Sequence, residues 1–236
     1  MASQCRPVDV QLGGVTIRLF EVPDLAETQW GGNDDPTGRV VWPSGFAAAA
    51  ELESLSARRK GGLVGLRVLE LGCGNGLASL AALRFGADVL ATDCAPSALA
   101  LVKRAANEAD AGAGSLKVAQ LDVASAEGAA AFDAFRPHVV VAADLLYSAE
   151  VATALGNLLR GRCPPAALIV VDPGRAGRGR FLQAYAGGDA DAFFDLVFEK
   201  VPEDRQPKTF RGEAAPPSDR LGRLAVGLDA LIDTMS

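Results

Sequence analysis

Short apolar runs alternate with longer mixed stretches through most of this chain. Runs without polar interruption predict strands that are buried on both faces, and they stand at residues 66–71, 88–93, 116–123, 138–144 and 166–171. Mixed stretches between or after these runs predict helices at residues 77–83, 98–109, 151–159 and 181–185. Parallel strands need crossover connections of this kind. The pattern therefore predicts an α/β fold, with a mostly parallel sheet and helices on both faces.

The N-terminal part predicts different elements. Residues 8–22 alternate between apolar and polar positions around Gly13-Gly14, which predicts a β-hairpin. Residues 29–39 are polar and rich in glycine, so we expect a loop, which serves either as a mobile lid or as an ordinary linker. Residues 46–57 then predict a helix with Glu51 on its exposed side.

The C-terminal part supplies two more apolar runs, at residues 193–201 and 221–228, which we interpret as antiparallel strands. Residues 202–217 between them are charged and rich in proline, so we expect irregular structure there. The chain shows no internal repeat and no second core. We expect an N-terminal extension at residues 1–39 and one domain at residues 40–236.

Composition narrows the function classes. The 236 residues carry a net charge of −6, which disfavours binding to a phosphate backbone. The 4 cysteines form no C-x-x-C pair and suggest reduced thiols, not a metal or disulfide framework. The single histidine, His138, favours a structural role. No apolar run reaches the length of a membrane span, and the first residues lack a secretory signal. We expect a cytoplasmic protein without a membrane or nucleic-acid partner; an organelle location stays open.

The chemistry centres on the stretch Glu70-Leu71-Gly72-Cys73-Gly74-Asn75-Gly76, between the first predicted strand and its helix. A glycine turn at this place opens a cofactor crevice in α/β folds. Its G-x-G-x-G spacing differs from the G-x-G-x-x-G of dinucleotide sites. Glu70 would repel a pyrophosphate but suits a ligand with a positively charged amino acid end. An ordinary strand-to-helix turn is the alternative.

This stretch resembles the first motif of the seven-strand methyltransferases, whose methyl donor is S-adenosylmethionine. The resemblance implies a Rossmann-like sheet with strand order 3-2-1-4-5-7-6. It also implies that Glu70, Gly72, Gly74 and Gly76 bind the cofactor.

Carboxylates follow the next two predicted strands. Asp93 lies about 20 residues past the glycines, where an acid binds ribose hydroxyls in nucleotide sites. In the methyltransferase resemblance, Asp122 meets the adenine amino group and Val123 packs against the ring. A plain aspartate at a strand end is the alternative for Asp122.

Two further motifs resemble the protein-lysine methyltransferases called methyltransferase family 16. The W-P-S-G segment that begins at Trp42 implies a tryptophan beside the cofactor; core packing is the alternative. The D-L-L-Y segment from Asp144 to Tyr147 matches the family's D-x-x-Y motif, where donor and target amine meet, and Ala143 before it is assigned to the cofactor site. A helix N-cap is the alternative for Asp144, and both roles can coexist. The motif lacks the prolines of N/D-P-P-Y enzymes that act on amides and bases.

The D-P-G-R segment that ends at Arg175 resembles the branch of this family that methylates the beta subunit of the electron-transfer flavoprotein. Arg175, Arg178 and Arg180 cluster there. A solvated loop, a site for an acidic patch on a protein partner, and nucleic-acid contact are the three interpretations.

These observations predict an S-adenosylmethionine-dependent protein-lysine N-methyltransferase, with Asp144 and Tyr147 as catalytic residues. We expect a monomer without a metal ion, whose partner is a protein that carries the target lysine. A small-molecule amine N-methyltransferase uses the same core and remains an alternative. A non-catalytic methyltransferase-like binding module is a further one, although such a module need not retain Asp144 and Tyr147.

Overall fold

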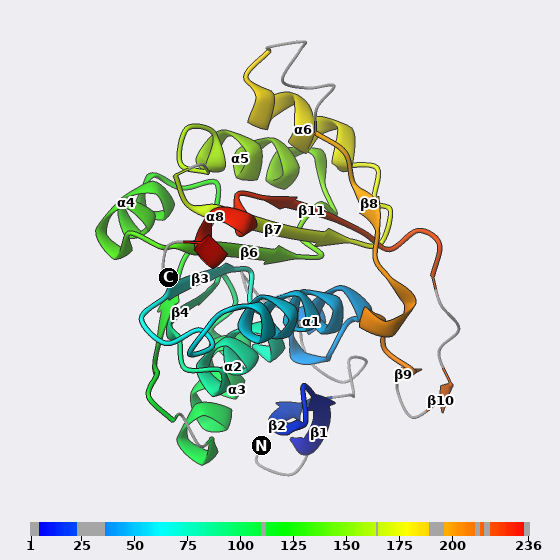
Figure 1. Ribbon diagram of the computed structural model, residues 1–236. Coiled ribbons are helices and arrows are strands. Elements are labelled where there is room, and N and C mark those ends of the chain that lie inside the picture. Colours follow the sequence, from blue (N-terminus) through cyan, green and yellow to red (C-terminus); the bar gives the residue numbers. More distant parts are fainter. Residues whose placement is uncertain are drawn as a thin grey trace.

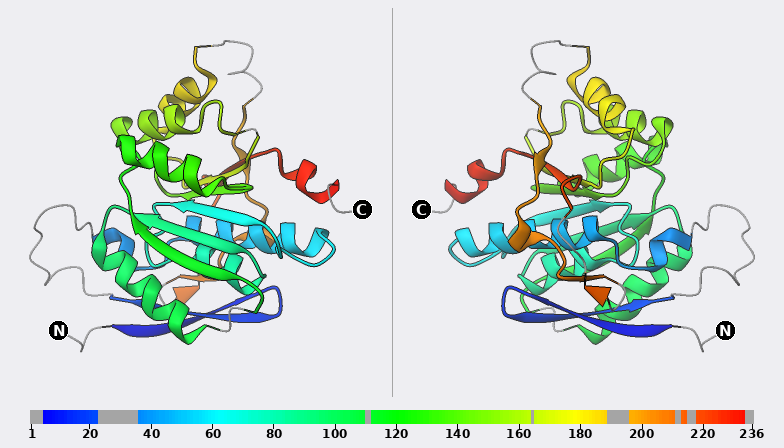
Figure 2. Two further views of the ribbon diagram at one scale, coloured as in Figure 1. Left: turned by 90° about the vertical axis from the view of Figure 1, so that its left-hand side faces the viewer. Right: turned by 90° about the vertical axis from the view of Figure 1, so that its right-hand side faces the viewer.

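A seven-stranded sheet forms the centre of the molecule, with helices on both of its faces (Figures 1 and 2). The computed structural model describes residues 5–22, 36–109, 112–163, 165–188, 196–210, 213–214 and 218–233. Along the sheet the strands are ordered β5 (Ser115–Gln120), β4 (Asp88–Asp93), β3 (Arg67–Leu71), β6 (Val139–Ala143), β7 (Ala167–Asp172), β11 (Gly222–Val226) and β8 (Glu199–Lys200).

The pairing directions agree with those expected from the sequence. The first five strands in this order are parallel to one another, whereas β11 runs antiparallel to both β7 and β8. In order of appearance along the chain, this is the predicted arrangement 3-2-1-4-5-7-6. The predicted strand at 193–201 is reduced to the two residues of β8, and residues 193–195 lie outside the described part of the chain.

Alternate residues of each central strand enter different cores. In β3, Val68 packs with the helices of one face, and Leu69 and Leu71 pack with those of the other. Both faces are therefore buried, which explains why the strands are apolar without interruption. The first face is covered by α1 (Pro43–Arg58), α2 (Leu77–Arg84) and α3 (Pro96–Glu108), and the second by α4 (Ala126–Phe135), α5 (Ala149–Leu159) and α6 (Arg178–Ala186) (Figure 1).

The N-terminal hairpin, β1 (Arg6–Leu12) and β2 (Val15–Glu21), forms as predicted and packs against helices, away from the central sheet (Figure 1). Its residues Ile17, Leu19 and Phe20 are buried in the core that contains α1 and α2. The hairpin thus belongs to the same hydrophobic core as the sheet.

Several elements differ from the sequence-based expectation. Residues 36–39 of the predicted loop form the 3-10 helix η1 (Pro36–Arg39), and residues 29–35 lie outside the described residues. Helix α4 was not predicted; its N-cap is Ser125, whose side chain accepts a hydrogen bond from the Gly128 amide. The segment expected to be irregular at 202–217 contains η2 (Glu203–Arg205) and the short pair β9 (Thr209–Phe210) and β10 (Glu213–Ala214), and the short helix α8 (Leu228–Asp233) follows β11.

Among the described residues, no helix has the length and apolar character needed to cross a membrane.

The prediction that Glu51 is exposed was wrong. Its side chain is buried on α1, and its Oε2 accepts hydrogen bonds from Nη1 of Arg205 (2.7 Å) and Nη1 of Arg223 (2.8 Å). These arginines come from η2 and β11, more than 150 residues later in the chain. Helical periodicity could not reveal this cover, because it is a tertiary contact.

We predict that Glu51→Gln lowers the free energy of unfolding by about 2–3 kcal/mol, since removal of one partner from a buried ion pair leaves the other charges uncompensated. The loss stays below that of a fully buried pair because both arginine side chains are partly exposed. Urea denaturation measures it. The control Glu53→Gln, on the same helix but half-buried, should change stability by less than about 0.5 kcal/mol. Equal losses for both variants would contradict the proposed role of the Glu51–Arg205–Arg223 ion pairs.

Candidate functional site

A cavity of about 410 Å³ lies at the carboxyl ends of the central parallel strands. Strand β3 stands between β4 and β6, so the chain leaves it toward one side of the sheet and later returns to the other. Ligand crevices of open α/β sheets form at this switch point. The volume is within the range of small-molecule sites.

Of the site residues predicted from the sequence, all except Gly76 line this cavity: Trp42, Glu70, Gly72, Gly74, Asp93, Asp122, Val123, Ala143, Asp144 and Tyr147. Gly76 instead caps α2 with a φ of +83°, and a Cβ at this position would lie 2.7 Å from Cγ2 of Val102. Gly76 therefore shapes the turn and does not face the cavity.

The glycine turn leaves no room for side chains. Gly72 has a φ of +66°, and a Cβ there would collide with the side chain of Leu145. A Cβ on Gly74 would lie 3.1 Å from the carbonyl oxygen of Gly38, in the segment that crosses over the turn. The absence of side chains lets the backbone border the cavity directly.

Asp93 ties this turn to the end of β4. Its Oδ2 accepts a hydrogen bond from the Gly74 amide (2.8 Å), and its Oδ1 accepts one from the Ala95 amide (2.8 Å). A carboxylate offers about four acceptor positions. Asp93 can therefore hold the turn and still accept hydroxyl protons from a ligand in the cavity that it lines.

Glu70 is buried at the end of β3, below the cavity. Its Oε2 accepts hydrogen bonds from the amide (2.8 Å) and the hydroxyl of Ser79, in the first turn of α2. Burial raises the pKa of Glu70 to about 7, although the Ser79 hydrogen bonds oppose this rise. A positively charged ligand group in the cavity would favour the ionised carboxylate.

Asn75 was not identified from the sequence, although it lies inside the glycine motif. Its side chain is 4% exposed and lines the cavity, and its Nδ2 has no hydrogen-bond partner in the described part of the chain. Buried amide donors are rarely left unsatisfied. A polar residue at this place in a glycine turn was the available signal, and its Nδ2 is a suitable donor for a carboxylate.

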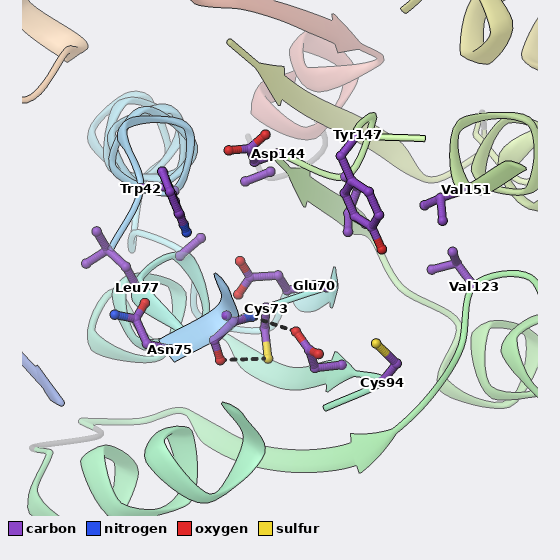
Figure 3. A pocket seen from close by; sticks show the side chains of 18 of the residues that line it. Trp42, Glu70, Cys73, Asn75, Leu77, Cys94, Val123, Asp144, Tyr147 and Val151 are labelled. Carbon is purple, nitrogen blue, oxygen red and sulfur yellow. Dashed lines mark hydrogen bonds between the residues drawn. The ribbon is translucent and has the colours of Figure 1, made fainter. Parts of the chain in front are cut away.

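The segment before α1 forms the wall above the glycine turn. The Val22 amide donates to the Arg39 carbonyl (3.0 Å), and the Val41 amide donates to Oε1 of Glu21 (2.7 Å), which joins this segment to the hairpin. Trp42 stands just before Pro43, the first residue of α1, and its side chain points into the cavity (Figure 3). Trp42 is half-buried, and it lines the cavity.

The strand predicted at 116–123 is shorter than expected, because β5 ends at Gln120. Asp122 and Val123 therefore lie in the turn between β5 and α4. Oδ1 of Asp122 accepts a hydrogen bond from the Ala124 amide (2.9 Å), which fixes the turn. Asp122 is exposed at the cavity rim, and Val123 supplies an apolar side chain beside it.

Asp144 follows the last residue of β6, Ala143, and has a φ of +58°. Such backbone strain in a non-glycine residue costs on the order of 1–3 kcal/mol and is concentrated at functional sites. Oδ1 of Asp144 accepts a hydrogen bond from Nε of Arg175 (2.7 Å). Burial raises the pKa of Asp144, and the Arg175 guanidinium opposes this shift.

The N-cap interpretation of Asp144 was wrong. Helix α5 begins later, and Ser148 caps it by accepting a hydrogen bond from the Val151 amide (3.1 Å). Asp144 is thus not the N-cap of this helix.

Tyr147 stands at the mouth of the cavity, on the opposite side from Trp42 (Figure 3). The residue is 52% exposed, which is unusual for a large aromatic side chain. Val151 lines the same cavity. Arg175 also lines the cavity; the sequence placed it in an arginine cluster but did not assign it to the site.

Comparisons with known proteins show the family to which the chain belongs. The profile of a family described as "Lysine methyltransferase" matches residues 23–178, which include the glycine turn, Asp144 and Tyr147. The chain belongs to the lysine methyltransferase family.

Solved structures of other methyltransferases share the fold. One, solved with S-adenosylhomocysteine, has a TM-score of 0.59 and 15% identity over 96% of this chain and 56% of its own. Another, from Streptococcus mutans, has a TM-score of 0.54 and 16% identity, with the same coverage of both chains. The T. thermophilus 16S rRNA N2 methyltransferase RsmC, solved with S-adenosylmethionine and guanosine, has a TM-score of 0.57 and 17% identity over 95% of this chain and 50% of its own.

The chain spans about half the length of these proteins. No curated protein sequence matches it.

The residues around the cavity fit the donor of this family. S-adenosylmethionine carries vicinal ribose hydroxyls, an adenine amino group and an amino acid end. Carboxylates at Asp93 and Asp122 suit the first two groups. Glu70 and Nδ2 of Asn75, which lacks a partner among the described residues, suit the third.

We predict that Asp93→Ala lowers the affinity for S-adenosylmethionine roughly ten- to hundredfold, because charge-assisted hydrogen bonds contribute about 1.5–3 kcal/mol. The variant also loses the acceptors of the Gly74 and Ala95 amides. Isothermal titration calorimetry measures the change. Asp88→Ala, at the opposite and exposed end of β4, is the control and should bind as the wild type does; tight binding of NAD, or equal effects of both substitutions, would contradict the assignment.

We predict that Trp42→Ala weakens donor binding severalfold while the protein still folds, because the half-buried ring faces the cavity. Calorimetry together with thermal melting separates the two effects. If the variant unfolds while each folded molecule keeps its donor affinity, Trp42 acts only in packing.

Proposed function

We propose that this methyltransferase transfers a methyl group to the ε-amino group of a lysine side chain in a protein. The observation that carries the proposal is the pairing of a half-buried carboxylate, Asp144, with an exposed aromatic ring, Tyr147, at one open mouth of the donor cavity. A carboxylate attracts an ammonium group, and an aromatic ring favours a cation beside its face.

We assign the interior of the cavity to the donor. Asp93 would accept the ribose hydroxyl protons, Asp122 the adenine amino protons, and Val123 would pack against the base. Asn75 and Glu70 would hold the amino acid end, near the first turn of α2. When bound there, S-adenosylmethionine supplies a methyl group that is already activated on a sulfonium sulfur.

The mouth of the cavity would receive the lysine. Asp144 would orient the amine by accepting a hydrogen bond from it, and the ring of Tyr147 would form a wall that shields it from water. A lysine must lose its proton to solvent before its nitrogen can attack. A dehydrated position near positive charge lowers the pKa of an amine, and the protein contributes mainly by this positioning and desolvation.

The exposure of Tyr147 supports a protein substrate over a small amine. A site for a small molecule encloses most of its ligand, whereas this ring is half exposed to solvent. A lysine on a protein surface reaches such an open site because its long side chain spans the distance. The net charge of −6 gives no support to an RNA substrate such as that of RsmC.

The D-P-G-R segment supports a narrower proposal, namely a target of the electron-transfer flavoprotein type. Purified flavoprotein is therefore the first acceptor to test, beside a proteome extract.

We predict that Asp144→Ala lowers kcat for lysine methylation at least tenfold while it changes donor affinity by less than twofold. An interaction made with the reacting amine affects kcat and kcat/KM together. Steady-state kinetics with labelled donor, and calorimetry for donor binding, measure the two effects. The companion variant Tyr147→Phe keeps the ring and removes the hydroxyl; it should stay active if the aromatic wall is what counts.

Mass spectrometry of the products decides the acceptor class. We expect methyl groups on lysine side chains of folded proteins and almost none on free lysine or nicotinamide, because a protein surface supplies binding energy that a small amine lacks. Methylation of small amines at comparable efficiency, with none on protein lysines, would favour the small-molecule alternative.

A further inference from the structure

The carboxylate assigned to the amine is already paired within the protein. Nε of Arg175 donates to Oδ1 of Asp144 at 2.7 Å, and both side chains line the donor cavity. Over the part of the chain that the structure describes, no other side chain donates a hydrogen bond to this carboxylate. The two residues come from neighbouring strand ends, after β6 and β7.

The backbone of Arg175 is itself held firmly. Asp172, fully buried at the end of β7, accepts hydrogen bonds on Oδ1 from the amides of Gly174 and Arg175, both at 2.8 Å. The same oxygen accepts one from Nε of Arg178 (2.6 Å). Gly174 has a φ of +93° and packs against Arg220. The D-P-G-R turn thus has a defined shape that aims the Arg175 side chain toward the cavity.

Asp144 benefits from such a partner because its carboxylate would otherwise rotate. Rotation about χ2 of an aspartate is broad and roughly two-fold, so an unpaired carboxylate does not present one fixed oxygen. With Oδ1 held by Arg175, Oδ2 is left to accept from an amine. The guanidinium also places a positive charge beside the amine, which disfavours the protonated and unreactive lysine.

We propose that Arg175 is a positioning residue, which holds Oδ1 of Asp144 so that Oδ2 faces the target amine. This inference rests on the proposed function, because it assigns Asp144 to the amine. It gives the D-P-G-R turn a role in catalysis and makes the Arg175–Asp144 pair part of the acceptor site.

The first experiment does not require turnover. The 13C chemical shift of the Asp144 carboxyl is titrated with pH in the wild type and in Arg175→Gln, with S-adenosylhomocysteine added. Asp172 also acts on this carboxyl, while Glu70 and Asp93 line the same cavity, and all three stay unchanged in the variant. Loss of the guanidinium should raise the pKa of Asp144 further, because burial then acts with less opposition. An unchanged titration would overturn the proposal.

The second experiment measures turnover and donor binding. Lysate protein and labelled donor are incubated with each variant, and methylated lysine is counted after hydrolysis. Arg175→Gln should lower kcat/KM roughly ten- to hundredfold, the size expected for loss of a charge-assisted hydrogen bond, with donor affinity unchanged. Arg175→Lys, which keeps the charge, should lose less. A gain of activity in Arg175→Gln would show that Arg175 competes with the amine, and would overturn the proposal.

A double-mutant cycle shows whether Arg175 acts through Asp144. In an Asp144→Asn background, Arg175→Gln should cost almost nothing further; a full additional loss would mean that Arg175 acts independently. The control Arg18→Gln removes another arginine–aspartate pair, between Arg18 and Asp9 on the hairpin, and should leave all values unchanged. If the wild type yields no methylated lysine, the proposed function fails, and the carboxyl titration still decides whether Arg175 controls Asp144.

Discussion

The parallel pairing of β3 with both β4 and β6 is the constraint on which the site depends. Parallel strands in register end at one edge, so the residues that follow them must meet there. Glu70, Asp93 and Asp144 come from these strand ends and are distant in sequence, yet they line one cavity. The apolar faces that bury the strands thereby fix the positions of the carboxylates, and the free energy of core packing keeps these charges at the cavity.

Each charged group at this edge has a compensating partner. Asp93 is held by backbone amides, Glu70 by Ser79 in the first turn of α2, and Asp144 by Arg175. A carboxylate buried without such partners would protonate or destabilise the fold. The partners leave acceptor capacity on each carboxylate. The site is therefore stable without a ligand and still able to bind one.

The cavity has two ends with different physical character. Its floor, at Glu70 and Asn75, is buried and polar, which suits the capture of a small charged donor. Its mouth, at Tyr147 and Arg175, is open to solvent and suits a side chain that arrives from another protein. Trp42 and the segment before α1, which is hydrogen-bonded to the hairpin, form one wall of the cavity. Under the proposed function, this difference in exposure would separate the donor from the acceptor.

The sequence by itself determined the α/β class, the strand order by way of the family resemblance, and most of the residues predicted to line the cavity. Apolar runs and a glycine motif are local signals, and strand ends are necessarily brought together by a parallel sheet. The sequence could not reveal the burial of Glu51, the position of Asn75 Nδ2 without a partner among the described residues, or the contact between Asp144 and Arg175. Those features depend on which side chains meet across loops, and only the tertiary structure decided them, because no periodicity records contacts between distant segments.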